Sequence, residues 1–205
     1  MKVLLLNGSP HEKGNTYTAL HEMQTVFESE GIETELLQLG GRDIRGCTAC
    51  GYCHTHSGCV FDDEVNTVAE KLKYSDGLVI GSPVYFASAN ATLVALLDRL
   101  FYSMDFDPSM KVGAAVCAAR RGGLTSTFDE LNKYFTISGM PVASGQYWNG
   151  IHGRKQGDAL QDAEGLQMMR TLARNMVFLM RSIALGREKF GLPEQEDKVA
   201  TNFVR

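Results

Sequence analysis

The sequence predicts an α/β fold in which helices cover both faces of a parallel sheet of five strands. Short apolar runs alternate along the chain with longer segments of helical spacing. The apolar runs are continuous rather than alternating, as expected for strands that are buried on both faces. The chain has 205 residues, of which 44% are hydrophobic, so it is large enough for one domain with a full core.

The first part of the chain predicts two strands with a helix between them. Val3–Leu6 is a continuous apolar run and forms the first strand. A helix is expected to begin with Thr16 near its N-cap and to reach about Ser29, because Gly31 then ends it. Glu33–Leu39 is the second strand.

The middle of the chain continues this alternation. A second helix is expected over Asp62–Tyr74, since Asp62 and Asp63 place acidic side chains in its first turn. We interpret both aspartates as helix caps rather than as catalytic groups. Gly77–Gly81 is a strong third strand, and Ala91–Tyr102 is helical.

The last part supplies the remaining elements. Lys111–Ala119 is the fourth strand, Thr125–Ser138 is helical, and Val142–Trp148 is expected to be the fifth strand. A long helix over Asp162–Leu185 carries methionines at helical spacing, which we assign to the core. The tail Gly186–Arg205 is polar and expected to be irregular, either mobile or packed on a second subunit.

These elements give one domain over residues 1–185, with a cysteine-rich insertion at 46–60, and a tail over 186–205. The net charge of −4 gives no electrostatic reason to expect nucleic acid as a partner. No apolar run approaches the roughly 20 residues that a membrane helix needs, so no membrane association is expected. The apolar stretch in Met1–Asn7 is too short for a signal peptide, and the cytoplasm is the expected location.

The loop Gly8–Thr16 predicts a phosphate site. In an open α/β sheet, ligands bind beyond the carboxyl ends of the strands, where a helix N-terminus offers free N–H groups. Ser9, Asn15 and Thr16 add side-chain donors, and Gly14 permits close approach of the backbone. The loop lacks the dinucleotide and P-loop fingerprints, so a terminal phosphate ester fits better than a pyrophosphate. The alternative is an ordinary polar turn that Thr16 caps.

Two other strand ends carry unusual loops. Ser82–Asn90 follows the third strand and contains two aromatic residues after a stiffening proline, so a flat aromatic ligand fits there. Ala118–Gly123 follows the fourth strand. A phosphate pocket beside a pocket for an aromatic ring is the outline of FMN. Cys117, at the end of the fourth strand, is expected in the core. Trp148, the only tryptophan, is expected either to stack near a flavin or a partner subunit, or to pack in the core.

Four of the five cysteines lie in the spacing C-x2-C-x2-C-x5-C, at Cys47, Cys50, Cys53 and Cys59. Thiolates this close surround small clusters of soft metal ions, and three explanations compete. An iron–sulfur cubane is favoured because three cysteines overlap in one run. Zinc is the second, since His54 and His56 lie close, although zinc sites usually pair two separate knuckles. The third is that no metal binds.

Taken together, these motifs resemble those of the flavodoxin-like NADPH-dependent FMN reductases, and within them the iron–sulfur flavoproteins. The resemblance implies a doubly wound sheet of order 2-1-3-4-5 with FMN in its crevice. The residues that carry it are Asn7 to Thr16, Cys47 to Cys59 followed by Asp62 and Asp63, Ser82 to Phe86, Asp98 and Arg99, and Arg120 to Gly123.

The resemblance also implies which residues hold each part of FMN. The phosphate falls to Ser9, His11, Gly14, Asn15 and Thr16; the flavin ring is lined by Pro83, Val84, Tyr85 and Phe86; and the far side is closed by Arg120, Arg121, Gly122 and Gly123. One departure is His11, where many relatives place an arginine. A neutral imidazole binds phosphate more weakly than a permanent cation, and Lys13 is expected to compensate.

The predicted function is that of an FMN-dependent oxidoreductase that moves electrons between the flavin and a [4Fe–4S] cluster or NAD(P)H. No side chain is expected to act as a nucleophile or general acid. The alternatives are an NAD(P)H-dependent FMN or quinone reductase without a cluster, and a non-enzymatic electron-transfer flavoprotein. The expected electron donor is NAD(P)H or a ferredoxin-like protein. The cysteine segment is expected near the carboxyl edge of the sheet, where FMN sits, and a homo-oligomer, dimer or tetramer, is expected to complete the electron path.

Overall fold

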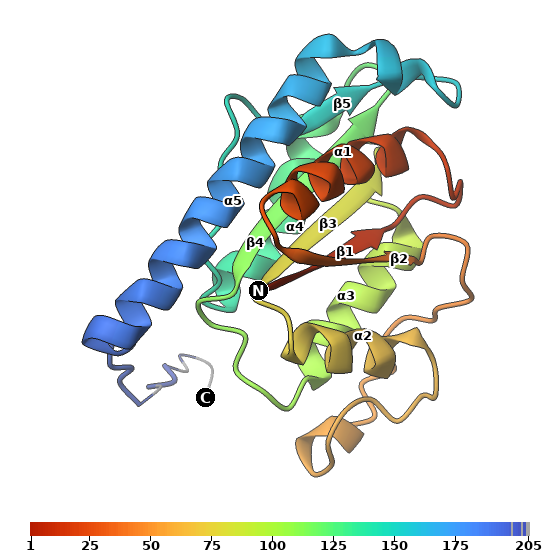
Figure 1. Ribbon diagram of the computed structural model, residues 1–205. Coiled ribbons are helices and arrows are strands. Elements are labelled where there is room, and N and C mark those ends of the chain that lie inside the picture. Colours follow the sequence, from red (N-terminus) through yellow and green to blue (C-terminus); the bar gives the residue numbers. More distant parts are fainter. Residues whose placement is uncertain (198, 202, 204–205) are drawn as a thin grey trace.

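The computed structural model describes residues 1–197, 199–201 and 203 and forms the predicted doubly wound fold (Figure 1). In this part of the chain, five parallel strands lie in the order β2-β1-β3-β4-β5, which is the flavodoxin-like order. The strands are β1 (Lys2–Asn7), β2 (Glu33–Gln38), β3 (Gly77–Pro83), β4 (Val112–Ala119) and β5 (Gly150–His152).

Helices cover the two faces of the sheet unequally. The helices are α1 (Asn15–Ser29), α2 (Glu64–Lys73), α3 (Ala91–Ser103), α4 (Leu124–Ile137) and α5 (Ala163–Phe190), with short 3₁₀ turns at η1 (Tyr52–His54) and η2 (Asp158–Gln161). One face carries α1 and α5, and the other carries α2, α3 and α4. Apart from the end of α5, the helix boundaries lie within two residues of those predicted.

The two cores are separated by the alternation of side chains along the central strands. Val3 and Leu5 of β1 pack in the core beneath α1 and α5, whereas Leu4 and Leu6 pack in the core beneath α2, α3 and α4. All four side chains are fully buried, which confirms that the continuous apolar run is a strand covered on both faces. The core position of the α5 methionines is confirmed for Met168, Met169, Met176 and Met180.

The predicted fifth strand, Val142–Trp148, is wrong. The strand that pairs with β4 is Gly150–His152, and Val142 makes only an isolated bridge to Gly113. Gly113 and Cys117 of β4 pair with residues 142 and 150, so the outer chain spans eight residues where β4 spans four. The surplus loops away from the sheet, and it carries Tyr147 and Trp148 to the surface. The core position that was one alternative for Trp148 is therefore excluded.

The expected end of the last helix is also wrong. The helix α5 continues past Leu185 to Phe190 and stops at Gly191, which has a left-handed φ of +77°. Gly186 lies inside α5 and does not interrupt the helix. A side chain at this position would meet open space, so packing does not require glycine there. Residues 198, 202, 204 and 205 of the predicted tail lie outside the described residues.

None of the described helices is both long enough and apolar enough to cross a membrane.

Candidate functional site

The loop between β1 and α1 is held in place by side chains from three other segments. Asn7 Oδ1 accepts a hydrogen bond from Ser9 N (3.1 Å), and Gln38 Nε2 donates to the carbonyl of Ser9 (2.6 Å). Asn90, the N-cap of α3, donates through Nδ2 to the carbonyl of Gly8 (2.7 Å). The loop therefore has a fixed shape without any ligand, and its position is set by β2 and α3.

Helix α1 begins as an anion-binding helix would. Gly14 occupies the N-cap, and within the described chain no side chain caps the helix. The expectation that Thr16 provides the cap is wrong, since Thr16 lies inside the first turn and is buried. A Cβ atom on Gly14 would lie 3.0 Å from His11 Cβ and 3.6 Å from Ser9 Oγ, so glycine leaves room for a ligand beside the first-turn N–H groups.

A cleft of about 330 Å³ opens in front of this helix, and we call it the β1–α1 cleft. It brings together residues from the ends of β1, β3, β4 and β5, which are the carboxyl ends of parallel strands. The lining residues are Ser9, His11, Gly14, Asn15, Thr16, Pro83, Val84, Tyr85, Ala118, Arg120, Gly153, Arg154 and Gln156. Most of the residues that the sequence assigned to FMN therefore meet in one cleft.

The positive charge in the cleft differs from expectation. Lys13, expected to compensate for His11, is not among the lining residues, whereas Arg120 and Arg154 are. Sequence reasoning missed Gly153, Arg154 and Gln156. The rule that ligands bind at strand ends would have found them, but the misplaced fifth strand hid the fact that they follow β5. A Cβ atom on Gly153 would lie 2.6 Å from Asn15 Nδ2, so this loop packs tightly against the start of α1.

The aromatic loop after β3 forms a strained turn. Tyr85 and Ser88 exchange backbone hydrogen bonds of 2.9 and 3.0 Å, and the two residues between them have left-handed φ angles, +51° for Phe86 and +61° for Ala87. Such a conformation is unfavourable for residues other than glycine. The turn directs Phe86 fully into solvent, away from the cleft, while Tyr85 lines it.

The remaining predicted residues, Arg121, Gly122 and Gly123, are not among the described residues that line the cleft, and Gly123 lies against this turn. Gly123 is the N-cap of α4 with φ of +86°, and a Cβ atom there would lie 2.8 Å from Ala87 Cα. Glycine at this position lets the start of α4 approach the turn. A role of Phe86 and of residues 121–123 in holding a flavin stays a prediction.

The cleft fits FMN at both ends. An uncapped helix N-terminus, His11 and two arginines suit a phosphate, and the turn at Pro83–Tyr85 provides an apolar and aromatic wall for a flat ring. Because Gly14 and Gly153 occupy positions where a side chain would collide with the loop, the phosphate end is a cradle built from backbone.

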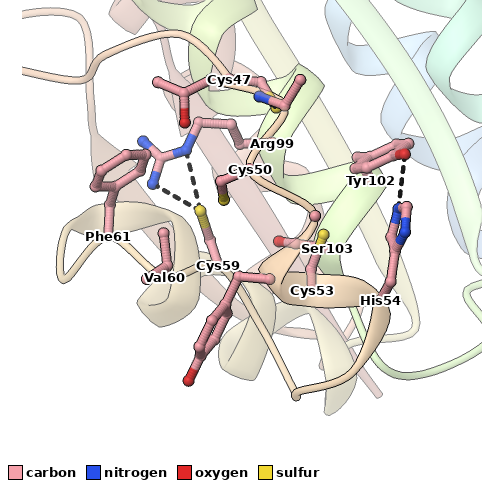
Figure 2. Close-up of a pocket in the computed structure, with 14 residues that line it drawn as sticks. Cys47, Cys50, Cys53, His54, Cys59, Val60, Phe61, Arg99, Tyr102 and Ser103 are labelled. Atoms are coloured by element: carbon pink, nitrogen blue, oxygen red, sulfur yellow. Dashed lines mark hydrogen bonds between the residues drawn. The ribbon is translucent and has the colours of Figure 1, made fainter.

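The four clustered cysteines line a second, smaller cavity of about 80 Å³, which we call the cysteine pocket (Figure 2). Cys47 and Cys50 are exposed, and Cys53 and Cys59 are half-buried. In the described part of the chain, all four are free thiols. The other side chains shown in Figure 2 include Phe61, from the segment before α2, and Arg99, Tyr102 and Ser103 of α3.

The backbone and the donors around the cysteines fit an iron–sulfur cluster. Ala49, Gly51 and Gly58 have left-handed φ angles, which turn the chain sharply between the thiols, and Ala49 N donates to Cys47 Sγ (3.4 Å). Four thiols in one cavity are the donor set that such clusters use. In the described residues, no three histidine, cysteine or acidic side chains are already arranged around a metal-sized point. The loop would therefore have to close on a cluster.

The two histidines near the cysteines make contacts with aromatic rings. His54 Nε2 lies 2.8 Å from Tyr102 Oη, and the ring of His56 stacks on Tyr52 with centroids 4.1 Å apart. His54 lines the cysteine pocket, but His56 does not. Therefore His54, but not His56, lies where it could act as a zinc ligand in the cysteine pocket.

The expectation that the cysteines lie beside the FMN site is wrong. The segment starts at the carboxyl edge, next to β2, but the cysteine pocket is built on the C-terminal half of α3. Asn90 at the start of α3 contacts the β1–α1 loop, whereas Arg99 is roughly 14 Å further along the helix axis at 1.5 Å per residue. The two cavities share no lining residue in the described chain, and Figure 1 shows the cysteine loop beyond α2 and α3.

The predicted capping role is confirmed for Asp63, whose Oδ1 accepts a hydrogen bond from Val65 N (3.2 Å) at the start of α2. It is wrong for Asp62, which lies one residue before the N-cap. The expectation for Cys117 is also confirmed. Cys117 is fully buried in the core, and burial together with the nearby charge of Glu130 raises the pKa of its thiol to about 12. Trp148 is half-exposed, beside Tyr147, and lines a separate pocket between β5 and the start of α5.

Comparison with known proteins agrees with this geometry. The chain matches the family described as NADPH-dependent FMN reductase over residues 1–154. It is 33% identical over 191 residues to an iron–sulfur flavoprotein of Methanocaldococcus jannaschii, covering 89% of this chain and 99% of that protein. It is 30% identical over 194 residues to an iron–sulfur flavoprotein of Methanosarcina thermophila, covering 92% and 100%.

Among solved structures, a similar fold occurs in RosB, crystallised with the intermediate 8-demethyl-8-formylriboflavin-5'-phosphate. The TM-score is 0.72 at 18% identity, and the match covers 100% of this chain and 94% of that one. Likeness at this level of identity supports the fold alone. The extent of the family match, with the cleft at the carboxyl edge of a 2-1-3-4-5 sheet, shows that the chain belongs to the NADPH-dependent FMN reductases, a family of FMN-binding flavoprotein oxidoreductases.

Proposed function

We propose that this protein is an oxidoreductase that binds FMN in the β1–α1 cleft and moves electrons between the flavin and a [4Fe–4S] cluster held by Cys47, Cys50, Cys53 and Cys59. The observation that carries the proposal is the cleft itself. Segments far apart in the sequence converge there on an uncapped helix N-terminus at one end and on Pro83 to Tyr85 at the other. The names of the relatives support the cluster.

The side chains of the cleft bind and orient rather than react. We assign the FMN phosphate to the N–H groups at the start of α1, with Ser9, Asn15 and Thr16 as donors and with Arg120 and Arg154 as permanent cations. Pro83, Val84 and Tyr85 face the flavin ring and exclude water from one side of it. FMN, when bound, accepts a hydride and releases single electrons, and a [4Fe–4S] cluster carries one electron at a time.

We further propose that a homo-oligomer, dimer or tetramer, completes the electron path. The cysteine pocket and the cleft share no lining residue and lie at opposite ends of α3. A second subunit that places its cleft against the cysteine loop would shorten the path. Sedimentation of the holoprotein at micromolar concentration is expected to give a dimer or tetramer, and a monomer would contradict this part of the proposal.

The occupancy of both sites is tested by anaerobic purification followed by an absorption spectrum and by assays of iron, sulfide and FMN. Flavin bands with a broad additional visible absorption are expected. Substitution Cys50→Ser should remove the broad absorption and the iron but leave FMN, whereas Cys117→Ala, outside both cavities, should leave both. A colourless protein with stoichiometric zinc would contradict the proposal.

A second candidate is an NAD(P)H-dependent FMN or quinone reductase in which the cysteines hold no cluster. The observation in its favour is that, among the described residues, no cysteine lines the β1–α1 cleft, so hydride transfer to a flavin there does not require them. It predicts that Cys50→Ser oxidises NAD(P)H with free FMN or a quinone at the wild-type rate. Loss of that activity in Cys50→Ser favours the cluster.

The electron donor separates these enzymes from a third candidate, a non-enzymatic carrier between ferredoxin-like partners. We propose NAD(P)H or a ferredoxin-like protein as the donor, because either can reduce a bound flavin. Steady oxidation of NAD(P)H would identify an enzyme. Reduction by a ferredoxin without turnover of NAD(P)H would favour the carrier.

A further inference from the structure

Arg99 is a buried cation at the boundary of the cysteine pocket. It lies on α3, its side chain is 1% exposed, and the ring of Phe61 lies 5.0 Å from its guanidinium carbon. A buried guanidinium is costly unless its charge and its N–H donors are matched. Its partners therefore indicate what holds it there.

Every N–H of this guanidinium is used. Nε and Nη2 donate to Cys59 Sγ at 3.3 and 3.1 Å, Nη1 and Nη2 donate to the two carboxylate oxygens of Asp63 at 2.5 and 3.0 Å, and Nη1 donates to the carbonyl of Arg45 at 3.1 Å. Among the described residues these bonds account for all of the donors that an arginine has. The guanidinium thus forms one fork on a sulfur and another on a carboxylate.

Cys59 differs in this respect from the other three cysteines of the pocket. Figure 2 shows the two bonds from Arg99 to its sulfur, whereas among the described residues the only hydrogen bond to another of these sulfurs is the longer one from Ala49 N to Cys47. Asp63 also caps α2, and so Arg99 ties Cys59 to α2 and α3 together. Within the described part of the chain, no arginine bond of this kind ties the other three thiols to α2 or α3.

We propose that Arg99 is a positioning residue that fixes Cys59 and raises the reduction potential of the cluster, with Asp63 opposing it. This inference rests on the proposed cluster. Reduction adds one electron, so the cluster becomes more negative by one charge. A positive charge and N–H bonds at one ligating sulfur favour that form, and a negative charge behind it disfavours that form.

The pair of residues allows a test by sign. Arg99→Met removes the cation and both bonds to sulfur, so the midpoint potential should fall. Asp63→Asn removes the anion but keeps an acceptor for the α2 cap, so the potential should rise. A purely structural loosening of the loop would move both variants in the same direction. Arg99→Lys keeps the charge without the fork, and its potential should lie between those of wild type and Arg99→Met.

The experiment is an anaerobic dithionite titration of reconstituted protein, followed by electron paramagnetic resonance of the cluster. Arg42→Met is the matched control, because Arg42 is an exposed cation of the same segment that pairs with Glu64, outside the cysteine pocket. FMN content and thermal unfolding measure whether each variant is folded. If Arg99→Met does not fold, Arg99→Lys replaces it in the test, and its potential should fall below that of wild type.

Opposite shifts in Arg99→Met and Asp63→Asn, with little change in Arg42→Met, are the expected result. Unchanged potentials, or shifts of the same sign, overturn the role of Arg99 while leaving the cluster itself established. Wild-type protein that takes up no iron and sulfide overturns both this inference and the proposed cluster. If that iron-free protein still binds FMN, the proposed flavin site remains supported.

Discussion

The carboxylate of Glu130 on α4 accepts hydrogen bonds from Ser88 Oγ at 2.8 and 3.0 Å, and it also accepts one from Ala89 N at 2.8 Å. This contact crosses from α4 to the loop after β3. It fixes the end of the turn in which Phe86 and Ala87 hold left-handed backbone angles. A strained turn persists only where its surroundings determine it, so Glu130 is one reason that Tyr85 faces the cleft.

Substitution Glu130→Gln should weaken FMN binding, although Glu130 itself does not line the cleft. The neutral amide would lose the charge-assisted bonds to Ser88 and Ala89, worth about 1–2 kcal/mol, so a Kd for FMN higher by roughly tenfold is expected. Fluorescence titration of the apoprotein with FMN measures this. Asp129→Asn, on the exposed neighbouring position, is the control and should bind like wild type. Equal affinity in both variants would show that the turn does not depend on Glu130.

Substitution Gly40→Ala should displace the phosphate loop. A Cβ atom at Gly40 would lie 2.2 Å from the carbonyl oxygen of Gly8 and 2.4 Å from that of Ser9, which are backbone atoms that cannot rotate away. We expect a loss of stability of about 2 kcal/mol or more, together with weaker FMN binding. Gly41→Ala is a matched control, because its nearest neighbour, Pro10 O, is 3.9 Å away. Thermal unfolding of the two variants makes the comparison, and equal melting temperatures would contradict the packing described.

Substitution Arg154→Ala should reduce affinity for FMN but not for riboflavin. Arg154 lines the end of the cleft assigned to the phosphate, and riboflavin lacks that phosphate. A charge-assisted bond contributes about 1.5–3 kcal/mol, so a loss of tenfold or more in FMN affinity is expected.

The control for Arg154 is its neighbour Lys155, which does not line the cleft. Both backbone N–H groups donate to Asp158 Oδ2, at 2.9 and 2.7 Å, so either alanine variant should keep the loop in place. Equal losses for FMN and riboflavin would indicate that Arg154 supports the loop rather than the phosphate.

The thiol of Cys117 should be inert in the native protein. Burial and the charge of Glu130 raise its pKa to about 12, so at pH 8 roughly one molecule in ten thousand carries the thiolate. Iodoacetamide labelling of the apoprotein at pH 8, mapped by mass spectrometry, should modify the exposed Cys47 and Cys50 and leave Cys117 unmodified until the protein is denatured. Labelling of Cys117 at the rate of Cys47 would contradict its position in the core.

The sequence was most informative where structure depends on local pattern. Val3–Leu6 and Gly77–Gly81 could be recognised as strands because burial on both faces makes them continuously apolar. The β1–α1 loop could be recognised because its glycines and polar donors follow a strand directly. Strand β5 consists of Gly150–His152, which is too short to show a strand pattern. The apolar residues of Val142–Trp148 resemble a strand more closely, so the sequence predicts the fifth strand there instead.

Contacts between segments that are distant in the sequence could not be predicted from it. Arg154 reaches the cleft only because β5 lies beside β4. The fork between Arg99 and Cys59 joins residues 40 positions apart and depends on how the cysteine loop packs against α3. The direction of the cysteine loop, away from the cleft, follows from the same packing and could not be inferred from its attachment to the second strand.

Electron transfer between bound FMN and the cluster is the central claim. It is tested most directly by reducing the flavin with a light pulse, with EDTA as the sacrificial electron donor, in anaerobic, reconstituted protein. Flavin absorption and, in freeze-quenched samples, the resonance signal of the reduced cluster are followed together. We predict that in wild type the flavin is reoxidised as the cluster signal appears, and that in Cys50→Ser the flavin stays reduced. Equal persistence of the reduced flavin in wild type and Cys50→Ser, in wild-type protein shown to contain the cluster, would contradict the claim.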